Sequence, residues 1–135
     1  MKVIFTNGCF DLLHYGHIKF LQKARMLGDV LIVAINSDAS VKRLKGPGRP
    51  IMKAKDRVKM LEGLSCVDCA VIFDEDTPIN IIEWLKPDVL VKGGDWKKKD
   101  VVGRKYAKEV VIIPYLKGYS TTEIIKKCNL IKQKS

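Results

Sequence analysis

Short, uninterrupted apolar runs alternate with longer segments of helical periodicity along the whole chain. The runs are rich in β-branched residues and show no polar alternation, as expected for strands that are covered on both faces. Turn-forming residues or helical segments separate them, so successive runs need crossover connections. We therefore predict five buried strands, at Val3–Thr6, Val30–Ile35, Cys69–Phe73, Val89–Val91 and Val110–Ile113.

The segments between these runs predict helices. Apolar residues recur at helical spacing over Leu12–Leu27, and Gly28 follows where a helix stop is expected. Thr77 and Pro78 have the N-cap and first-turn chemistry of another helix, which would end at Leu85. The capping-box pattern of Ser120–Glu123 marks the start of a last helix. The remaining helices are predicted over Ser37–Leu44, over Asp56–Leu64 and, as a short one, between the last two strands.

Strands that alternate with helices imply a parallel sheet with right-handed crossovers and helices on both faces. The chain has 135 residues, which is near the commonest size of one domain. Because no linker or internal repeat divides it, we predict a single α/β domain over residues 1–135, Rossmann-like and doubly wound, with a five-stranded sheet. Ligands of such sheets bind outside the carboxyl ends of the strands. Functional residues are therefore expected just after each strand.

The charge balance narrows the classes of partner. The chain has 25 Lys and Arg against 15 Asp and Glu, a net charge of +10, which favours nucleic acid, acidic lipid or phosphorylated small molecules. No apolar stretch approaches the roughly 20 residues of a membrane span, and the N-terminal run is too short for a signal peptide. We expect a cytoplasmic protein that does not associate with membranes. A basic nucleic-acid-binding module is an alternative, but the lysines form no stripe and no recognition motif is present, so we expect no nucleic acid partner.

Cys66 and Cys69 have the two-residue gap of a zinc knuckle or a redox pair. A closed zinc site needs four ligands, and no second Cys or His pair has matching spacing. Cys69 also opens an apolar run, where a buried thiol behaves as a small hydrophobic side chain. We interpret this pair as structural thiols, with a metal or redox role as the alternative.

The richest strand-end motif follows the first strand. His14 and His17, the two histidines of the chain, lie three residues apart at the start of a predicted helix, so their rings share one face. Free main-chain N–H groups and the positive end of the helix dipole lie beside them. Gly8 permits a tight turn, and Gly16 leaves no side chain between the rings. We expect a triphosphate to lie across this gap, although two helix-capping histidines would give the same pattern.

These residues resemble a known signature. His14-Tyr15-Gly16-His17 after the turn Gly8–Asp11 is similar to the His-x-Gly-His motif of the nucleotidyltransferase superfamily. Over nearly its whole length the chain resembles one subfamily, the D-glycero-β-D-manno-heptose 1-phosphate adenylyltransferases. These occur as stand-alone enzymes or as the C-terminal half of a fused kinase–adenylyltransferase. Further segments that carry the resemblance are Asn36–Val41, Leu44–Pro50, Phe73–Pro78, Asp88–Asp95 and Gly118–Thr122.

The resemblance implies that ATP and heptose 1-phosphate give ADP-heptose and pyrophosphate, for the lipopolysaccharide inner core, by direct attack on the α-phosphorus with Mg²⁺ assisting. It also implies a homodimer. Lys45 would join the two histidines in catalysis and, with Arg49, hold the substrate phosphate, while Asp11 either caps the first helix or helps to place Mg²⁺. The implied nucleotide-binding residues are Asn7, Gly8, Cys9, Phe10, His14, Gly16, His17, Lys92, Gly93, Asp95, Tyr119, Ser120, Thr121 and Thr122.

Two sister activities on the same fold stay open, glycerol-3-phosphate cytidylyltransferase and FMN adenylyltransferase. The cytidylyltransferases have an Arg-Thr-Glu-Gly stretch before their Ser-Thr-Thr. Here that stretch is Tyr115-Leu116-Lys117-Gly118, which weakens a CTP assignment and fits the heptose branch. The residues around the base and the acceptor cannot be inferred from the sequence, so an assay of nucleotide dependence must separate the three activities.

Overall fold

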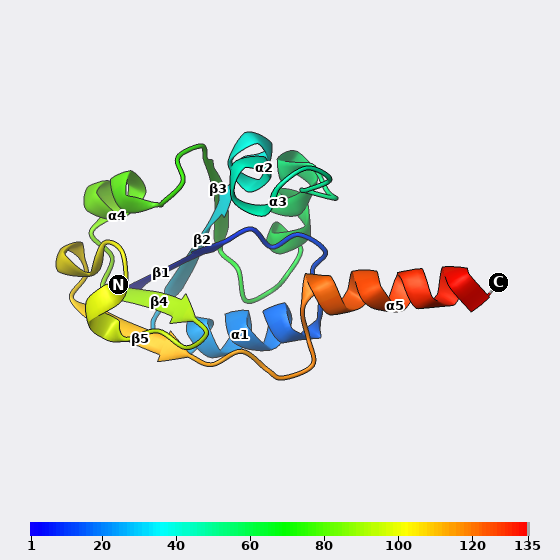
Figure 1. Ribbon diagram of the computed structural model, residues 1–135. Coiled ribbons are helices and arrows are strands. Elements are labelled where there is room, and N and C mark those ends of the chain that lie inside the picture. Colours follow the sequence, from blue (N-terminus) through cyan, green and yellow to red (C-terminus); the bar gives the residue numbers. More distant parts are fainter. Residues whose placement is uncertain (135) are drawn as a thin grey trace.

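The computed structural model describes residues 1–134, and its centre is one parallel sheet (Figure 1). The strand order is β3-β2-β1-β4-β5, and every neighbouring pair is parallel. The predicted fold class is therefore confirmed. The strands are β1 (Val3–Gly8), β2 (Val30–Asn36), β3 (Cys69–Phe73), β4 (Val89–Gly93) and β5 (Glu109–Ile113).

Helices connect the strands, and they match the predicted segments with shifted ends. They are α1 (Tyr15–Arg25), α2 (Asp38–Lys45), α3 (Ala54–Glu62), α4 (Ile79–Leu85) and α5 (Thr121–Lys134). The predicted short helix before β5 is a pair of 3₁₀ turns, η1 (Lys98–Asp100) and η2 (Arg104–Tyr106).

The first helix is shorter than predicted at both ends. Phe10 and Leu12 adopt left-handed φ angles of 48° and 53°, so the chain is still in a loop where a helix was expected to begin. At the other end, α1 stops at Arg25 with Met26 as its C-cap. Gly28 is therefore not the helix stop. A glycine is needed there for packing, because a Cβ at this position would lie 2.8 Å from the carbonyl oxygen of Lys2, just before β1.

The predicted start of α4 is also wrong. Pro78 is the N-cap and the helix begins at Ile79, so Thr77 does not cap it. The preceding segment is held as a loop by the guanidinium group of Arg43 on α2. This group pairs with the carboxylate of Asp76 at 3.0 Å and donates to the carbonyl oxygen of Asp74.

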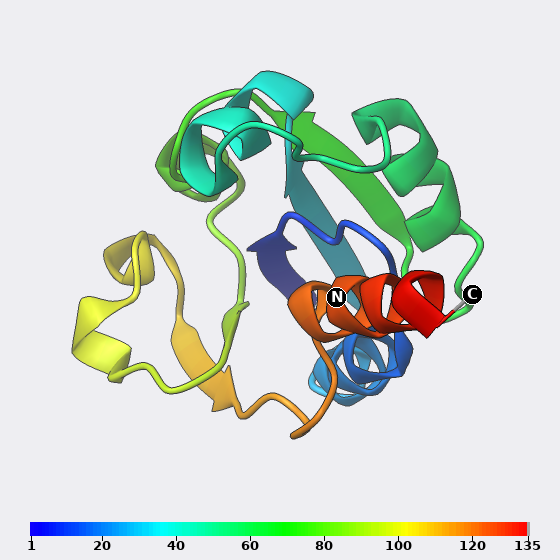
Figure 2. The same ribbon diagram turned by 45° about the vertical axis from the view of Figure 1, so that its right-hand side comes forward.

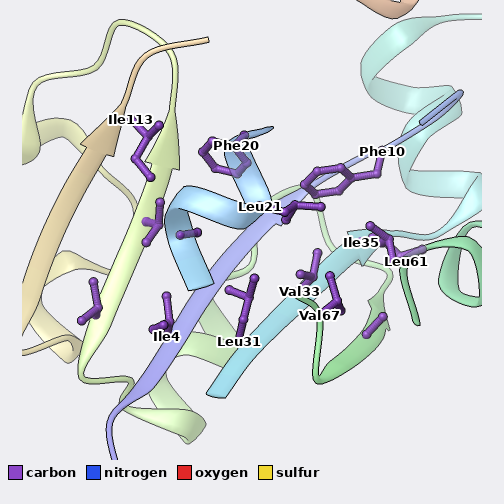
Figure 3. Close-up of a cluster of buried hydrophobic side chains, with 14 of the residues drawn as sticks. Ile4, Phe10, Phe20, Leu21, Leu31, Val33, Ile35, Leu61, Val67 and Ile113 are labelled. Carbon is purple, nitrogen blue, oxygen red and sulfur yellow. The ribbon is translucent and has the colours of Figure 1, made fainter. Parts of the chain in front are cut away.

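The core has two parts because alternate residues of each strand point to opposite faces of the sheet. Ile4 belongs to a cluster that includes Leu21 of α1 and Leu61 of α3 (Figure 3). Its neighbour Phe5 belongs to a second cluster, which includes Ile82 of α4. Both faces of β1 are therefore covered, which explains its uninterrupted apolar sequence.

The strand order reverses on either side of β1, since β2 and β4 both pair with it. This places a crevice at the carboxyl ends of the strands, where ligands of such sheets bind. The start of α5 lies at this edge, and the rest of the helix carries the C-terminus away from the sheet (Figures 1 and 2). In residues 1–134, no helix is long and apolar enough to cross a bilayer.

Candidate active site

A cavity of about 540 Å³ opens at the carboxyl edge of the sheet. Its walls come from the segments after β1, β2, β3 and β5 and from the end of β4. The structure thus brings together most of the residues that the sequence predicted. These are Asn7, Gly8, Cys9, Phe10, Asp11, His14, His17, Lys45, Arg49, Lys92, Tyr119, Ser120, Thr121 and Thr122.

The loop after β1 folds back on itself to form the floor. Phe10 is buried, and a Cβ at Gly8 would lie 2.9 Å from its ring, so glycine lets the ring close over the end of the strand. The same ring lies 5.1 Å from the imidazole of His17, measured between centroids. Phe10 therefore packs beneath the histidine as part of the core cluster and also lines the cavity, so its predicted contact with a nucleotide stays a prediction.

His14 and His17 form a stacked pair. Their ring centroids are 3.7 Å apart with an interplanar angle of 24°. The expected gap between the rings is therefore absent, and a triphosphate can only lie along their edges. His14 is the N-cap of α1, and its main-chain N–H donates to Nδ1 of His17 at 3.2 Å.

Burial favours the neutral form of both imidazoles. Burial, with a smaller contribution from the charge of His14, lowers the pKa of His17 to about 4, and burial also lowers the pKa of His14. Because Nδ1 of His17 accepts a hydrogen bond, the proton of its neutral ring sits on Nε2. Among residues 1–134, Nδ1 of His14 is a buried polar atom without a hydrogen-bond partner. The pair therefore offers at least one N–H donor and one unsatisfied nitrogen.

Gly16 does not line the cavity, but its lack of a side chain leaves room for the neighbouring rings of His14 and Tyr119. A Cβ at this position would lie 2.8 Å from Cβ of Tyr119 and about 3 Å from the His14 ring, at 3.0 Å from Cε1 and 3.1 Å from Nδ1. The Tyr119 ring in turn stacks on His14 at 6.4 Å between centroids. Glycine is thus required for the close packing of α1 against the segment that leads into α5.

Asp11 has a different role from either predicted one. Its side chain is buried, and its two oxygens accept the main-chain N–H groups of Ile51 at 2.7 Å and Met52 at 2.9 Å. It therefore does not cap α1. Among residues 1–134, no cluster of three or more His, Cys, Asp or Glu side chains could hold a metal ion. The residues that the structure describes therefore form no protein site for Mg²⁺.

Arg57 lines neither cavity but supports the site from beneath, and nothing in the sequence indicated this role. Its guanidinium group is fully buried and donates to the carbonyl oxygens of Cys9 at 2.8 Å and Met52 at 2.9 Å. Its third contact is an ion pair with Asp38 at 2.9 Å. It thereby ties the loop after β1 to α2 and to the segment before α3. One arginine in a helix that also carries Lys55 and Lys59 gives no sign of this in the sequence.

The start of α5 supplies hydroxyl groups, but one is already engaged. Thr121 donates its hydroxyl proton to the carbonyl oxygen of Asp11 at 2.6 Å, so it cannot also donate to a phosphate as predicted. Ser120 accepts the main-chain N–H of Glu123 at 3.0 Å, which leaves its own proton for a ligand. This contact is one half of the predicted capping box.

The wall on the side of β2 and β3 holds Lys45 and Arg49. Four further residues of this wall were not predicted as site residues, Asn36, Val41, Leu44 and Asp76. Asn36 ends β2 and accepts a hydrogen bond from the Cys9 thiol at 3.7 Å between sulfur and oxygen. The rule that functional residues follow the strands would have found Asn36, because it is the first polar residue after that apolar run.

A second cavity of about 440 Å³ adjoins the first on the side of β4 and β5. The predicted residues Gly93 and Asp95 line this cavity, whereas Lys92 lines both. The Lys92 ammonium lies 4.8 Å from the centroid of Trp96, and burial lowers the pKa of Lys92. Tyr115, which was not predicted, also lines both cavities.

Proteins of known sequence are similar to this chain. The bifunctional protein HldE of Helicobacter pylori strain 26695 is 60% identical over 126 residues, which is 93% of this chain and 27% of that protein. The HldE protein of Campylobacter concisus is 62% identical over the same shares of the two chains. The chain thus spans about a quarter of the length of these curated relatives.

Solved structures are similar as well. The lipopolysaccharide core biosynthesis protein of Thermoplasma volcanium superposes with a TM-score of 0.72 at 29% identity, covering 89% of this chain and 99% of that one. Pantothenate synthetase of Thermus thermophilus has a TM-score of 0.57 at 16% identity, over 94% and 64% of the two chains, and shares the fold. A family model described as cytidylyltransferase-like matches residues 5–127, from β1 into α5. The chain therefore belongs to the cytidylyltransferase-like family.

Proposed function

We propose that this chain transfers AMP from ATP to D-glycero-β-D-manno-heptose 1-phosphate, releasing pyrophosphate and giving ADP-heptose. The observation that carries this proposal is the stacked histidine pair at the centre of a cavity with cationic or hydroxyl groups on both sides. The high identity to HldE proteins and the likeness to a lipopolysaccharide core biosynthesis protein support the choice of acceptor.

In this reaction a phosphate oxygen of the sugar attacks the α-phosphorus of ATP. The new P–O bond forms as the bond to the bridging oxygen of the β-phosphate breaks, and pyrophosphate leaves with that oxygen. Such transfers depend on positioning and on stabilising spread negative charge. The cavity offers no covalent nucleophile next to a base, and burial raises the pKa of Cys9, which keeps its thiol protonated.

His17 is assigned the central contact. Its Nδ1 is occupied by the N–H of His14, so its Nε2–H is available to donate to an oxygen of the α-phosphate. Because the donor is neutral, substrate binding does not require the desolvation of a charged imidazolium. As charge builds on the five-coordinate phosphorus, the hydrogen bond strengthens, and one such donor is typically worth about 10²–10³ in turnover.

The two walls of the cavity would bind different substrates, one the β- and γ-phosphates of ATP and the other the phosphate of the sugar. Ser120 and the free N–H groups at the start of α5 would hold the β- and γ-phosphates, with Lys92 beside them. Lys45 and Arg49 on the opposite wall would hold the phosphate of the sugar. Because the histidines lie between the walls, the attacking oxygen would reach the α-phosphorus from the side opposite the leaving pyrophosphate.

The base and ribose would occupy the second cavity. This cavity adjoins the phosphate site, because Lys92 lines both. Asp95 would supply a carboxylate that accepts a hydrogen bond from a ribose hydroxyl, and Trp96 would supply an aromatic surface. A cavity of about 440 Å³ is within the usual range for small-molecule sites, which is roughly 300–1,000 Å³.

We also propose that the enzyme is a homodimer, is cytoplasmic and needs Mg²⁺. A divalent cation that reaches the site bound to substrate phosphates needs few protein ligands. Gel filtration with light scattering tests the dimer, and dependence of activity on added Mg²⁺ tests the metal.

The decisive assay measures pyrophosphate release by the purified chain with ATP or CTP against three acceptors, heptose 1-phosphate, glycerol 3-phosphate and FMN. We expect the combination of ATP and heptose 1-phosphate to be fastest. The His17→Ala variant serves as the background control. A clear preference for CTP, or for ATP with FMN, would overturn the sugar assignment and indicate a sister activity.

A further inference from the structure

Tyr115 stands at the boundary between the two cavities. It follows β5 and Pro114 directly, and it lines both the phosphate cavity and the cavity assigned to the base. Lys92 is the one other residue found in both linings. A nucleotide with its triphosphate in one cavity and its base in the other must pass these two side chains.

The ring of Tyr115 rests against bare main chain. A Cβ at Gly93 would lie 2.6 Å from Cε1, 2.8 Å from Cζ and 2.9 Å from the hydroxyl oxygen of this ring. A Cβ at Gly94 would lie 3.1 Å from its Cε2. The two consecutive glycines therefore create the space that the ring occupies.

Packing covers only part of the ring. Phe20 approaches it with a centroid distance of 6.0 Å, yet 61% of the Tyr115 surface is exposed. Trp96, across the second cavity, is 47% exposed. An aromatic ring that is backed by glycines and open on the cavity side is suited to stack on a planar ligand.

We propose that Tyr115 stacks on the base of the bound nucleotide and favours a purine over a pyrimidine. This inference rests on the proposed nucleotidyltransferase function but not on the identity of the acceptor. A purine overlaps a tyrosine ring over two fused rings, whereas a pyrimidine overlaps it over one. Base stacking on an aromatic side chain contributes enough affinity for its loss to be measured as about a tenfold weakening.

The chain offers an internal reporter for this test. It has two tryptophans, Trp96 in the second cavity and Trp84 on α4, of which the latter is 83% exposed and belongs to neither cavity. A Trp84→Phe background leaves Trp96 as the single indole. Its fluorescence then reports a base in the second cavity, while calorimetry measures affinity without any acceptor present.

The experiment compares ATP and CTP binding in this background with Tyr115 intact, with Tyr115→Phe and with Tyr115→Leu. We expect ATP to quench Trp96 fluorescence and to bind more tightly than CTP. Tyr115→Phe should keep both affinities within about twofold, because the ring is kept. Tyr115→Leu should weaken ATP by about tenfold and CTP by less, so the ratio between them falls.

Gly93→Ala gives a second, independent variant, because its methyl group would displace the Tyr115 ring without removing it. It should reproduce the loss seen with Tyr115→Leu, while a melting temperature close to that of the parent shows that the fold is intact. An unchanged ATP to CTP ratio in Tyr115→Leu overturns the role of Tyr115 and leaves the proposed function standing. If the parent binds neither nucleotide, the proposed function fails as well.

Discussion

The main-chain N–H of His14 donates to Nδ1 of His17 at 3.2 Å, while the two rings stack with centroids 3.7 Å apart. The N-cap of α1 and a residue of its first turn are thus joined into one unit. The contact fixes the tautomer of His17 and aims the opposite edge of its ring away from the helix. His14, the N-cap of α1, therefore also orients His17, the residue proposed to donate to the phosphate.

We predict that His17 is a neutral, Nε2-protonated imidazole at pH 7. Its pKa is lowered to about 4 by burial, so protonation of Nδ1, which would break the bond from His14, is negligible at this pH. Two-dimensional ¹⁵N NMR of histidine-labelled protein distinguishes the tautomers directly. A predominantly Nδ1-protonated His17 would show that the hydrogen bond from His14 is not formed in solution.

Replacing His17 with alanine should lower turnover by roughly 10²–10³ and leave the KM for ATP less affected, because its donor acts mainly as charge builds in the transition state. Steady-state kinetics of pyrophosphate release measure both constants. Phe20→Leu provides a matched control, since it alters the packing of α1 near the cavity without removing a polar group. Near-normal turnover in His17→Ala would contradict the assigned contact.

The sequence predicts much of the fold because both faces of the sheet are covered. Each apolar run, such as Val30–Ile35, has to be a buried strand, and the alternation with helices leaves few topologies. Helix ends are predicted less well. Phe10 and Leu12 adopt left-handed φ angles that non-glycine side chains rarely take, and nothing in their identity signals this.

The candidate site was predicted where it depends on strand ends and missed where it depends on tertiary contacts. His14 and Ser120 lie in the segments after β1 and β5, Lys92 lies at the end of β4, and all three line the cavity. Arg57 lies within α3, lines neither cavity and supports the site only through its hydrogen bond to the carbonyl oxygen of Cys9 in the loop after β1. Its burial depends on acceptors 48 and 19 residues away in the chain, which periodicity does not reveal.

Gly16→Ala should impair catalysis while the protein stays folded. The added methyl group would lie 3.0 Å from the His14 ring and 2.8 Å from Tyr119, so one of them must move. A displacement of this size near a reacting group can cost about a hundredfold in rate. Turnover is compared with that of Gly63→Ala at the C-cap of α3, where the nearest atom is 3.3 Å away and outside the site. Equal turnover in the two variants would contradict the steric argument.

Arg57→Met should destabilise the protein by about 3 kcal/mol, because the carbonyl oxygens of Cys9 and Met52 lose a buried donor and Asp38 loses its partner. Urea denaturation measures the change in the free energy of unfolding. Arg43→Met is the control, since its ion pair with Asp76 and its hydrogen bond to the carbonyl oxygen of Asp74 are both exposed, and exposed ion pairs contribute at most about 1 kcal/mol. Similar losses in the two variants would show that the buried network contributes little.

Mild acid should destabilise the fold through the two histidines. The pKa of His17 is about 4 in the folded protein, against an ordinary value of 6.5 in the unfolded chain. Between these values the unfolded state binds a proton that the folded state does not, so the free energy of unfolding falls as pH drops from about 6.5 towards 4.

Burial lowers the pKa of His14 as well, so its contribution has the same sign. Because these are the only two histidines in the chain, the test is direct. Between pH 7.5 and 5.5, His17 alone should account for about 1 kcal/mol of lost stability. His17→Gln should remove that share of the pH dependence and His14→Gln/His17→Gln nearly all of it, as measured by urea denaturation at both pH values. A double variant with the slope of the parent would mean that neither ring is held neutral by its burial.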